Sequence, residues 1–205
     1  MKLLTACFLL ALTMALWAQA PPEGAAKGKG KGGDAAAKGK GGRGGVAQEA
    51  KAPTPPPIPQ VLRLVRANTY LVTGHGTNSI FRVTPMGVIL VDTKLGSAGD
   101  YERLAELIHG VTDKPVKYVV NTSTKPEAAG NNAKFQAAGA EIVSGEKVLA
   151  LGGAEARVIK VGESTVVYFP IEKLVVLGSV AKTSDALQKL DWTLAVPAMG
   201  EPVYR

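Results

Sequence analysis

The stretch VNTSTKPEAAGNN, residues 120–132, decides how this 205-residue sequence is interpreted. It is the second of three landmarks along the chain: GVILVDT at residues 87–93 precedes it, and VVYFP at 166–170 with LGS at 177–179 follows it. Each landmark lies at or next to an apolar run of strand length. The order and spacing of the three carry the assignment of the fold, because a single short motif would support far less.

Short apolar runs separated by turn residues surround these landmarks and predict strands. One helix is expected from Asp100, as its N-cap, to a stop at Gly110, and a second over Glu127–Ala138. Strands followed by alternating strands and helices predict a layered α/β or α+β domain. The expected strands are 61–65, 69–73, 80–84, 88–91, 116–120, 141–143, 157–161, 165–169, 174–177 and 193–196, with a short helix at 184–190.

With these landmarks in this order, residues 61–205 resemble the metallo-β-lactamase fold superfamily. That family shows a strand ending in Asp-Thr, then Asn-Thr-His-x-His-x-Asp-His-x-Gly-Gly-Asn, a later His before Tyr-Phe-Pro, a Gly-Asp and a terminal Pro-Gly-His-Gly. The resemblance implies a four-layer αββα sandwich of the α/β (α+β) class. Only 17 residues separate Ser179 from Pro197. The C-terminal half therefore looks shortened, and an outer helix is expected to be missing.

The reactive residues of the family pattern are replaced at every metal position. The resemblance places Ser123 and Lys125 at the first two histidines, Glu127 at the aspartate and Ala128 at the third histidine. Zinc needs three or four convergent imidazole, thiolate or carboxylate ligands, and a single carboxylate remains. The replaced positions further along the chain are Lys160, Ser179 and Met199. We therefore expect no zinc, no other cofactor and no catalytic residue of the family's hydrolytic mechanism.

Two interpretations of the emptied site remain open. Lys125 and Lys160 either form an ionic network with Asp92 and Glu127 in place of the metal charge, or leave a cationic pocket for a small anionic ligand. A plainer alternative is that both lysines extend into water. The resemblance also places His75, in a Gly-His-Gly turn, near the mouth of the cleft, although a solvated loop histidine is the commoner case. These five residues form the candidate pocket.

The first 59 residues predict a leader and a linker. Residues 1–20 have the layout of a secretory signal peptide, with Lys2, an apolar run, and small residues before cleavage after Ala20. Cys7, the only cysteine, leaves with this segment. Residues 21–59 form a Gly-, Lys-, Ala- and Pro-rich basic linker that is predicted to be disordered and contributes +4 of the formal net charge of +7.

The basic charge of the linker has two interpretations. It is either a solvated spacer or an electrostatic tether to an anionic envelope surface or polymer. The pI of about 9.5 mostly reflects this segment, so it gives no specific nucleic-acid signal for the folded part.

These observations predict an exported protein, periplasmic or secreted, with a metallo-β-lactamase-like domain at residues 60–205. The loss of the zinc ligands favours a pseudoenzyme with a binding, scaffold or regulatory role at the cell envelope. The alternative is a hydrolase of the same superfamily with weak or non-standard activity on an ester, lactam or phosphoester, for which Ser123, Lys125 and Glu127 would be the new reactive group. The sequence leaves the ligand and the oligomeric state open.

Overall fold

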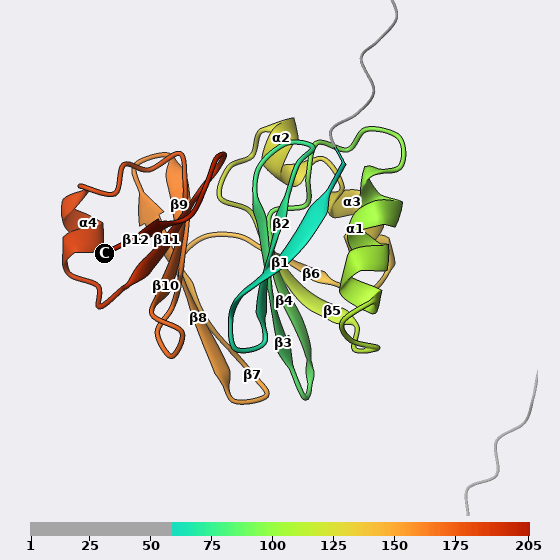
Figure 1. The fold of residues 1–205 in the computed structure, drawn as a ribbon, viewed down its shortest axis with the longest axis horizontal. Helices are drawn as coiled ribbons and strands as arrows, with labels where there is room; N and C mark the ends of the chain where they lie inside the picture. Colours follow the sequence, from blue (N-terminus) through green and yellow to red (C-terminus); the bar gives the residue numbers. More distant parts are fainter. Residues whose placement is uncertain (1–58) are drawn as a thin grey trace, which may run out of the picture. The chain divides into compact units, whose positions relative to one another are not determined.

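A computed structural model describes residues 59–205 of the chain, and the strands in this part form two six-stranded sheets (Figure 1). The predicted signal peptide at 1–20 and all but the last residue of the predicted linker at 21–59 lie outside the described residues. Within residues 59–205, no helix is long and apolar enough to cross a membrane.

The first sheet follows the chain order from β1 to β6. Its first four strands are antiparallel hairpins, and β4, β5 and β6 are parallel to one another. Parallel neighbours need a crossover, and helices supply it here. The elements are β1 (Val61–Arg66), β2 (Thr69–Thr73), β3 (Ser79–Thr84), β4 (Gly87–Val91), α1 (Asp100–His109), β5 (Val116–Val120), α2 (Pro126–Ala129), α3 (Asn132–Ala137) and β6 (Glu141–Val143).

The second sheet has the same consecutive arrangement, from β7 at one edge to β12 at the other. All its neighbouring strands are antiparallel except β10 and β11, which are parallel and joined through α4. The elements are β7 (Lys147–Leu151), β8 (Ala154–Val161), β9 (Ser164–Phe169), β10 (Leu174–Gly178), α4 (Asp185–Gln188), β11 (Leu194–Pro197) and β12 (Val203–Tyr204).

The main hydrophobic core lies between the two sheets. Leu71 and Ile89 of the first sheet pack in one cluster with Phe169 and Leu194 of the second, and all four side chains are fully buried. The strands bury side chains on their inner face, and helices cover their outer face. Because both faces are covered, the strands appear in the sequence as continuous apolar runs.

Helices cover the two outer faces unequally. Leu104 of α1 and Phe135 of α3 pack on the outer face of the first sheet, and α4 contributes Leu187 to the cluster on the second, beside Trp192 (Figure 1). The αββα order predicted from the sequence is thus confirmed. In the described residues, α4 is the only helix on the second sheet and has four residues, in agreement with the reduced outer layer that was expected.

Several predicted elements need correction. The helix predicted over Glu127–Ala138 is two helices, because the chain at Gly130 is tied to another loop: its N–H donates to the Lys94 carbonyl oxygen at 3.0 Å. Asp100 is the first residue of α1, with Gly99 as N-cap. Strands β7 and β12 were not predicted, and both are edge strands, where few side chains are buried.

Candidate functional site

The candidate site residues all lie on loops or strand ends that meet at one end of the sandwich. The loop after β5 contacts the second sheet, where the Thr165 N–H donates to the Thr122 carbonyl oxygen at 3.0 Å. The loop after β2 contacts the loop after β11, where the Asn78 N–H donates to the Ala198 carbonyl oxygen at 2.6 Å. These contacts bring together loops that are far apart in the sequence.

Asp92 follows β4 and is fully buried beneath these loops. Its backbone has φ of 62°, a left-handed conformation that is uncommon outside glycine. Both carboxylate oxygens accept hydrogen bonds from Thr122, one from the backbone N–H and one from the hydroxyl, each at 2.7 Å. Burial raises the pKa of Asp92 to about 7, and the hydrogen bonds from Thr122 oppose this shift.

Lys94, two residues later, is a buried charged residue beside this site that was not predicted from the sequence. Its side chain is fully buried. The Nζ atom donates to the carbonyl oxygens of Val72 at 2.7 Å and Thr77 at 2.8 Å. Burial lowers the pKa of Lys94 to about 7, against the opposing effect of the negative charges of Asp92 and Asp100. In the sequence it follows Asp92-Thr93 in the position of an ordinary loop lysine, so no pattern indicated its burial.

The loop from Ser123 to Ala128 is held by its backbone. The Ala128 carbonyl oxygen accepts bonds from the Thr93 N–H at 2.6 Å and the Thr93 hydroxyl at 3.2 Å. The Glu127 carbonyl oxygen accepts bonds from the N–H and the hydroxyl of Thr77, both at 3.0 Å. The Oε2 atom of Glu127 is buried without a hydrogen-bond partner among residues 59–205.

Lys125 and Lys160 are both exposed. Among the residues that the structure describes, neither forms an ion pair with Asp92 or Glu127, because every ion pair within 4.0 Å joins other residues. The ionic network considered for these lysines is therefore not formed. The buried ammonium group near Asp92 belongs to Lys94 instead.

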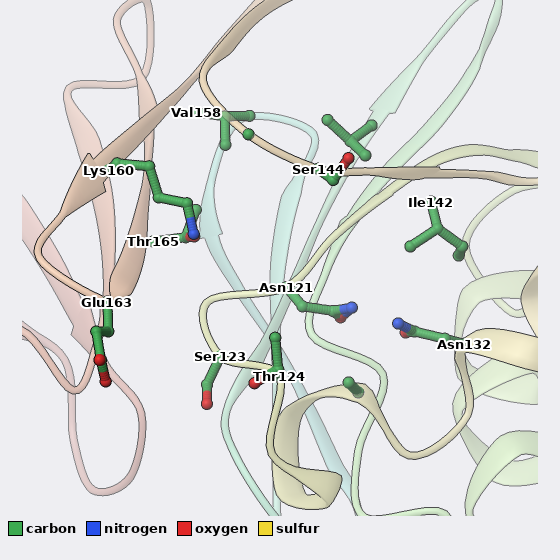
Figure 2. A pocket seen from close by; sticks show the side chains of 13 residues that line it. Asn121, Ser123, Thr124, Asn132, Ile142, Ser144, Val158, Lys160, Glu163 and Thr165 are labelled. Atoms are coloured by element: carbon green, nitrogen blue, oxygen red, sulfur yellow. The ribbon is translucent and has the colours of Figure 1, made fainter.

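Lys160 lines a pocket of about 270 Å³ (Figure 2). Figure 2 shows its side chain extending toward Thr165, while the Glu163 carboxylate points away from it. The side chains of Asn121 and Asn132 point toward each other from the opposite wall (Figure 2). The remaining lining residues are Ser123, Thr124, Ala129, Ile142, Val143, Ser144, Gly145 and Val158. The pocket thus offers an ammonium group, two amides and several hydroxyls, together with the Glu163 carboxylate that points away from Lys160.

The other residues predicted for the site lie outside the pocket beside Lys160. His75 and Met199 line a second hollow of about 580 Å³. Ser179 follows β10 and is exposed, and Lys125 lines neither hollow. The five residues of the candidate pocket are therefore divided: Lys160 lines one hollow, His75 another, and Asp92 lies buried between the loops.

The residues present do not fit the zinc that the fold family implies. Among residues 59–205, no group of three or more His, Cys, Asp or Glu side chains is placed where it could hold a metal ion. Apart from the single carboxylate of Glu127, the replaced positions carry hydroxyl, ammonium, methyl and thioether groups, which do not form a zinc ligand set, and nearby ammonium groups would repel a cation.

Comparisons with known proteins bear on the fold. No protein-family model and no curated protein matches the sequence. Solved structures do match. A metallo-β-lactamase from Pontibacter korlensis has 16% identity and a TM-score of 0.62, over 71% of this chain and 94% of that one. Metallo-β-lactamase IND-7 has 18% identity and a TM-score of 0.57, over 69% and 91%.

A third match is a metallo-β-lactamase from Cronobacter sakazakii with a HARLDQ motif, at 13% identity and a TM-score of 0.55, over 67% of this chain and 77% of that one. Identities this low establish the common architecture and nothing about activity. The chain therefore has the metallo-β-lactamase fold, and the part that the structure describes contains no metal-binding group.

Proposed function

We propose that this protein is an exported metallo-β-lactamase-fold pseudoenzyme that binds a small anionic ligand in the pocket beside Lys160. The observation that carries the proposal is the exchange of the metal-ligand positions for side chains that cannot hold zinc, while a polar pocket remains at the same end of the sandwich. Loss of the metal ligands removes the family's means of activating water, whereas a pocket can still bind.

The chemistry of the pocket supports an anionic ligand. The Lys160 Nζ atom has no hydrogen-bond or ion-pair partner among residues 59–205, so three N–H donors are available to a carboxylate or phosphate oxygen. The Asn121 Oδ1 atom is buried without a partner in the described part of the chain, and a donor on the ligand would satisfy it. A small carboxylate or phosphate that also carries a hydroxyl or N–H group therefore fits best.

The absence of metal-dependent hydrolysis is tested by calorimetric titration with zinc, combined with turnover assays on lactam, lactone and phosphoester substrates. We expect neither stoichiometric zinc binding nor metal-dependent turnover. Tight binding of one zinc ion, or turnover that a chelator abolishes, would establish the hydrolase alternative and overturn the proposal.

Ligand binding is tested with lactate and inorganic phosphate as probes, by calorimetry or by thermal shift. We expect Lys160→Met to weaken binding of whichever probe binds the unmodified protein by about tenfold or more, because the pocket loses its cation. Lys125→Met is the matched control, since Lys125 is also exposed but lies outside the pocket. Equal losses in both variants, or no binding of either anion, would count against the site.

Export and envelope attachment form a separate part of the proposal. We infer cleavage after Ala20, a periplasmic or secreted mature protein, and attachment of residues 21–59 to an anionic surface or polymer through their excess of +4 charges. Deletion of residues 21–59 should release the protein from the envelope fraction, and added salt should do the same to the full-length form. Unchanged association after the deletion would leave the segment as a spacer.

A further inference from the structure

A hollow of about 360 Å³, lined by residues of both sheets, lies at the end of the sandwich away from the pocket beside Lys160. The turn between β1 and β2 and the turn between β9 and β10 lie at this end, whereas α2 lies at the other (Figure 1). Strand β9 runs between the two ends, with Thr165 near its start and Glu172 in the turn that follows it. The hollow shares no lining residue with the pocket beside Lys160 and is a separate feature of the domain.

Two arginine side chains of this hollow lie in one row across the first sheet. Arg66 of β1 pairs with Thr69 of β2, which pairs in turn with Arg82 of β3. Paired residues of neighbouring antiparallel strands point to the same face. Here that face is turned toward the second sheet, because Leu71, two residues after Thr69, packs in the core between the sheets. Two like charges on a partly buried face require negative charge beside them.

Glu172 supplies only one negative charge to the two arginines. Its Oε1 atom lies 2.6 Å from the Arg82 Nε atom, and its carbonyl oxygen accepts a hydrogen bond from the Arg66 Nε atom at 3.2 Å. Lys173, the other cationic residue of the lining, is paired with Asp191 at 2.8 Å. Two guanidinium groups and one carboxylate therefore leave the hollow with one positive charge in excess.

The guanidinium group of Arg66 is held in place and still has donors to offer. Its Nε and Nη2 atoms donate to Glu172 and to the Thr193 hydroxyl, and both of these residues line the hollow. Its Nη1 atom donates to the Val65 carbonyl oxygen, and its Cζ atom lies 5.7 Å from the centre of the Tyr204 ring. Of the five N–H donors of the group, these three bonds leave two without an acceptor among residues 59–205. Because the group is already fixed at the wall of the hollow, it can bind a carboxylate with little loss of side-chain entropy.

Apolar surface adjoins this cationic group. Ile171 lines the same hollow, and 66% of its surface is exposed. A ligand that carries an aliphatic chain beside its anionic group would cover this side chain. The charge of the hollow favours a single negative charge on the ligand, because Glu172 lies beside the arginines and repels a dianion more strongly than a monoanion.

We propose that this hollow binds a small monocarboxylate with a short aliphatic chain. The carboxylate accepts hydrogen bonds from the Arg66 guanidinium group, and the aliphatic chain covers Ile171. The site lies outside the pocket beside Lys160 and does not depend on the ligand proposed there.

The test compares butyrate, acetate and inorganic phosphate, titrated calorimetrically in a low-salt buffer that contains no other carboxylate. The full-length protein is used both unmodified and as Lys160→Met, which removes the cation of the first pocket. In Lys160→Met we expect butyrate to bind about tenfold more tightly than acetate, because two further methylene groups are buried. Butyrate should also bind more tightly than phosphate. Equal affinity for butyrate and acetate, or tighter binding of phosphate, would overturn the proposal.

Arg66→Met removes the proposed carboxylate contact and should weaken butyrate binding about tenfold or more. Arg63→Met is the matched control, because Arg63 lies on the same strand but pairs with exposed Glu201 and does not line the hollow. Binding to the basic residues of 21–59 would be equal in both variants. The fluorescence of buried Trp192 checks that each variant is folded. Equal butyrate affinity in the two folded variants would exclude Arg66 as the carboxylate contact.

Ile171→Ser tests the apolar half of the site at an exposed position, where the fold should tolerate the change. It should bind acetate like the unmodified protein and reduce the preference for butyrate to less than about threefold. Met86→Ser is its control, since Met86 is 64% exposed but does not line the hollow, and it should keep the full preference. An unchanged preference in Ile171→Ser would contradict the proposal. Failure of anions to bind beside Lys160 concerns the other pocket alone, because the comparison of probes is made without that cation.

Discussion

The amine of Lys94 is buried, and two carbonyl oxygens take the place of the water molecules that normally solvate a lysine. Its Nζ atom donates hydrogen bonds to the carbonyl oxygens of Val72 and Thr77. Such a residue could not be predicted from the sequence, because a lysine after Asp92-Thr93 looks like any solvated loop lysine. Its burial depends on carbonyl groups of β2 and of the loop that follows it, about 20 residues earlier in the sequence. The seven replaced metal positions, in contrast, are assigned through the resemblance to the family pattern, one residue at a time.

Removing the Lys94 amine should therefore be costly. Lys94→Met leaves the Val72 and Thr77 carbonyl oxygens without this donor and the Asp92 and Asp100 carboxylates without a nearby cation, so we expect a loss of about 3 kcal/mol in unfolding free energy. Urea unfolding followed by Trp192 fluorescence measures it. Lys125→Met, at an exposed lysine, should change the value by less than about 0.5 kcal/mol. Similar values for the two variants would contradict the role of Lys94.

Asp92 should make stability depend on pH. Its pKa is raised from 3.8 to about 7 by burial, so the folded protein binds this proton more tightly than the unfolded chain does. Its contribution is fully present below about pH 4 and is lost as the pH rises through about 7. Asp92→Asn removes this ionisation. The unfolding free energy of the unmodified protein should therefore fall relative to that of Asp92→Asn between about pH 4 and about pH 7.

Urea titrations of both proteins across this range measure the difference. A constant difference would show that Asp92 does not change its charge on unfolding there. The lowered pKa of Lys94 acts at higher pH: its amine loses its proton near pH 7 in the folded protein and near 10.5 in the unfolded chain. Stability from this group therefore rises between these values, which keeps its effect apart from that of Asp92.

At the scale of elements, local pattern predicted the buried strands well because β4 and β10 bury all five of their residues. The predicted elements are wrong where tertiary contacts determine where a helix begins or ends. The predicted helix over Glu127–Ala138 is interrupted at Gly130, where the chain passes close to the backbone of Leu95 and Gly96. Nothing within the helix sequence encodes that contact, since glycine and asparagine are tolerated in helices at a modest cost.

Gly130 should be one of the glycines that cannot be replaced. Its backbone is right-handed, with φ of −62°, so an alanine would be acceptable conformationally, but its Cβ atom would overlap the Leu95 carbonyl group. We expect Gly130→Ala to cost about 1–3 kcal/mol in unfolding free energy. Gly110→Ala is a matched control, because Gly110 also ends a helix, with φ of −64°, and a Cβ atom there would make only ordinary contacts. It should be neutral or slightly stabilising; equal costs would exclude the close approach as the cause.

At the scale of the whole described domain, the two sheets are joined by more than their apolar core. The Arg82 Nε atom of β3 is 2.6 Å from the Glu172 Oε1 atom, which lies in the turn between β9 and β10, and the side chains are 13% and 4% exposed. Arg66 adds hydrogen bonds to the Glu172 carbonyl oxygen at 3.2 Å and the Thr193 hydroxyl at 3.2 Å. This cluster links the sheets around a separate shallow hollow that both arginines line.

Glu172→Gln should weaken this link. The variant leaves a nearly buried guanidinium group without its counter-charge, for which we expect a loss of about 3 kcal/mol. The matched control is Glu201→Gln, which breaks an Arg–Glu pair of 3.0 Å whose side chains are 43% and 76% exposed, and should change stability by less than about 0.5 kcal/mol. Thermal and urea unfolding compare the two; equal effects would show that burial of the ion pair does not matter.

The consecutive strand order of each sheet has a consequence for how the domain can be divided. All strands of the first sheet precede Ser144 and all strands of the second follow Glu146, so a single short connection joins the two halves covalently. Each half completes its own backbone hydrogen-bonding ladder without strands from the other. A chain cleaved in this connection should therefore reassemble from two separately produced fragments, held together mainly by the side chains buried between the sheets.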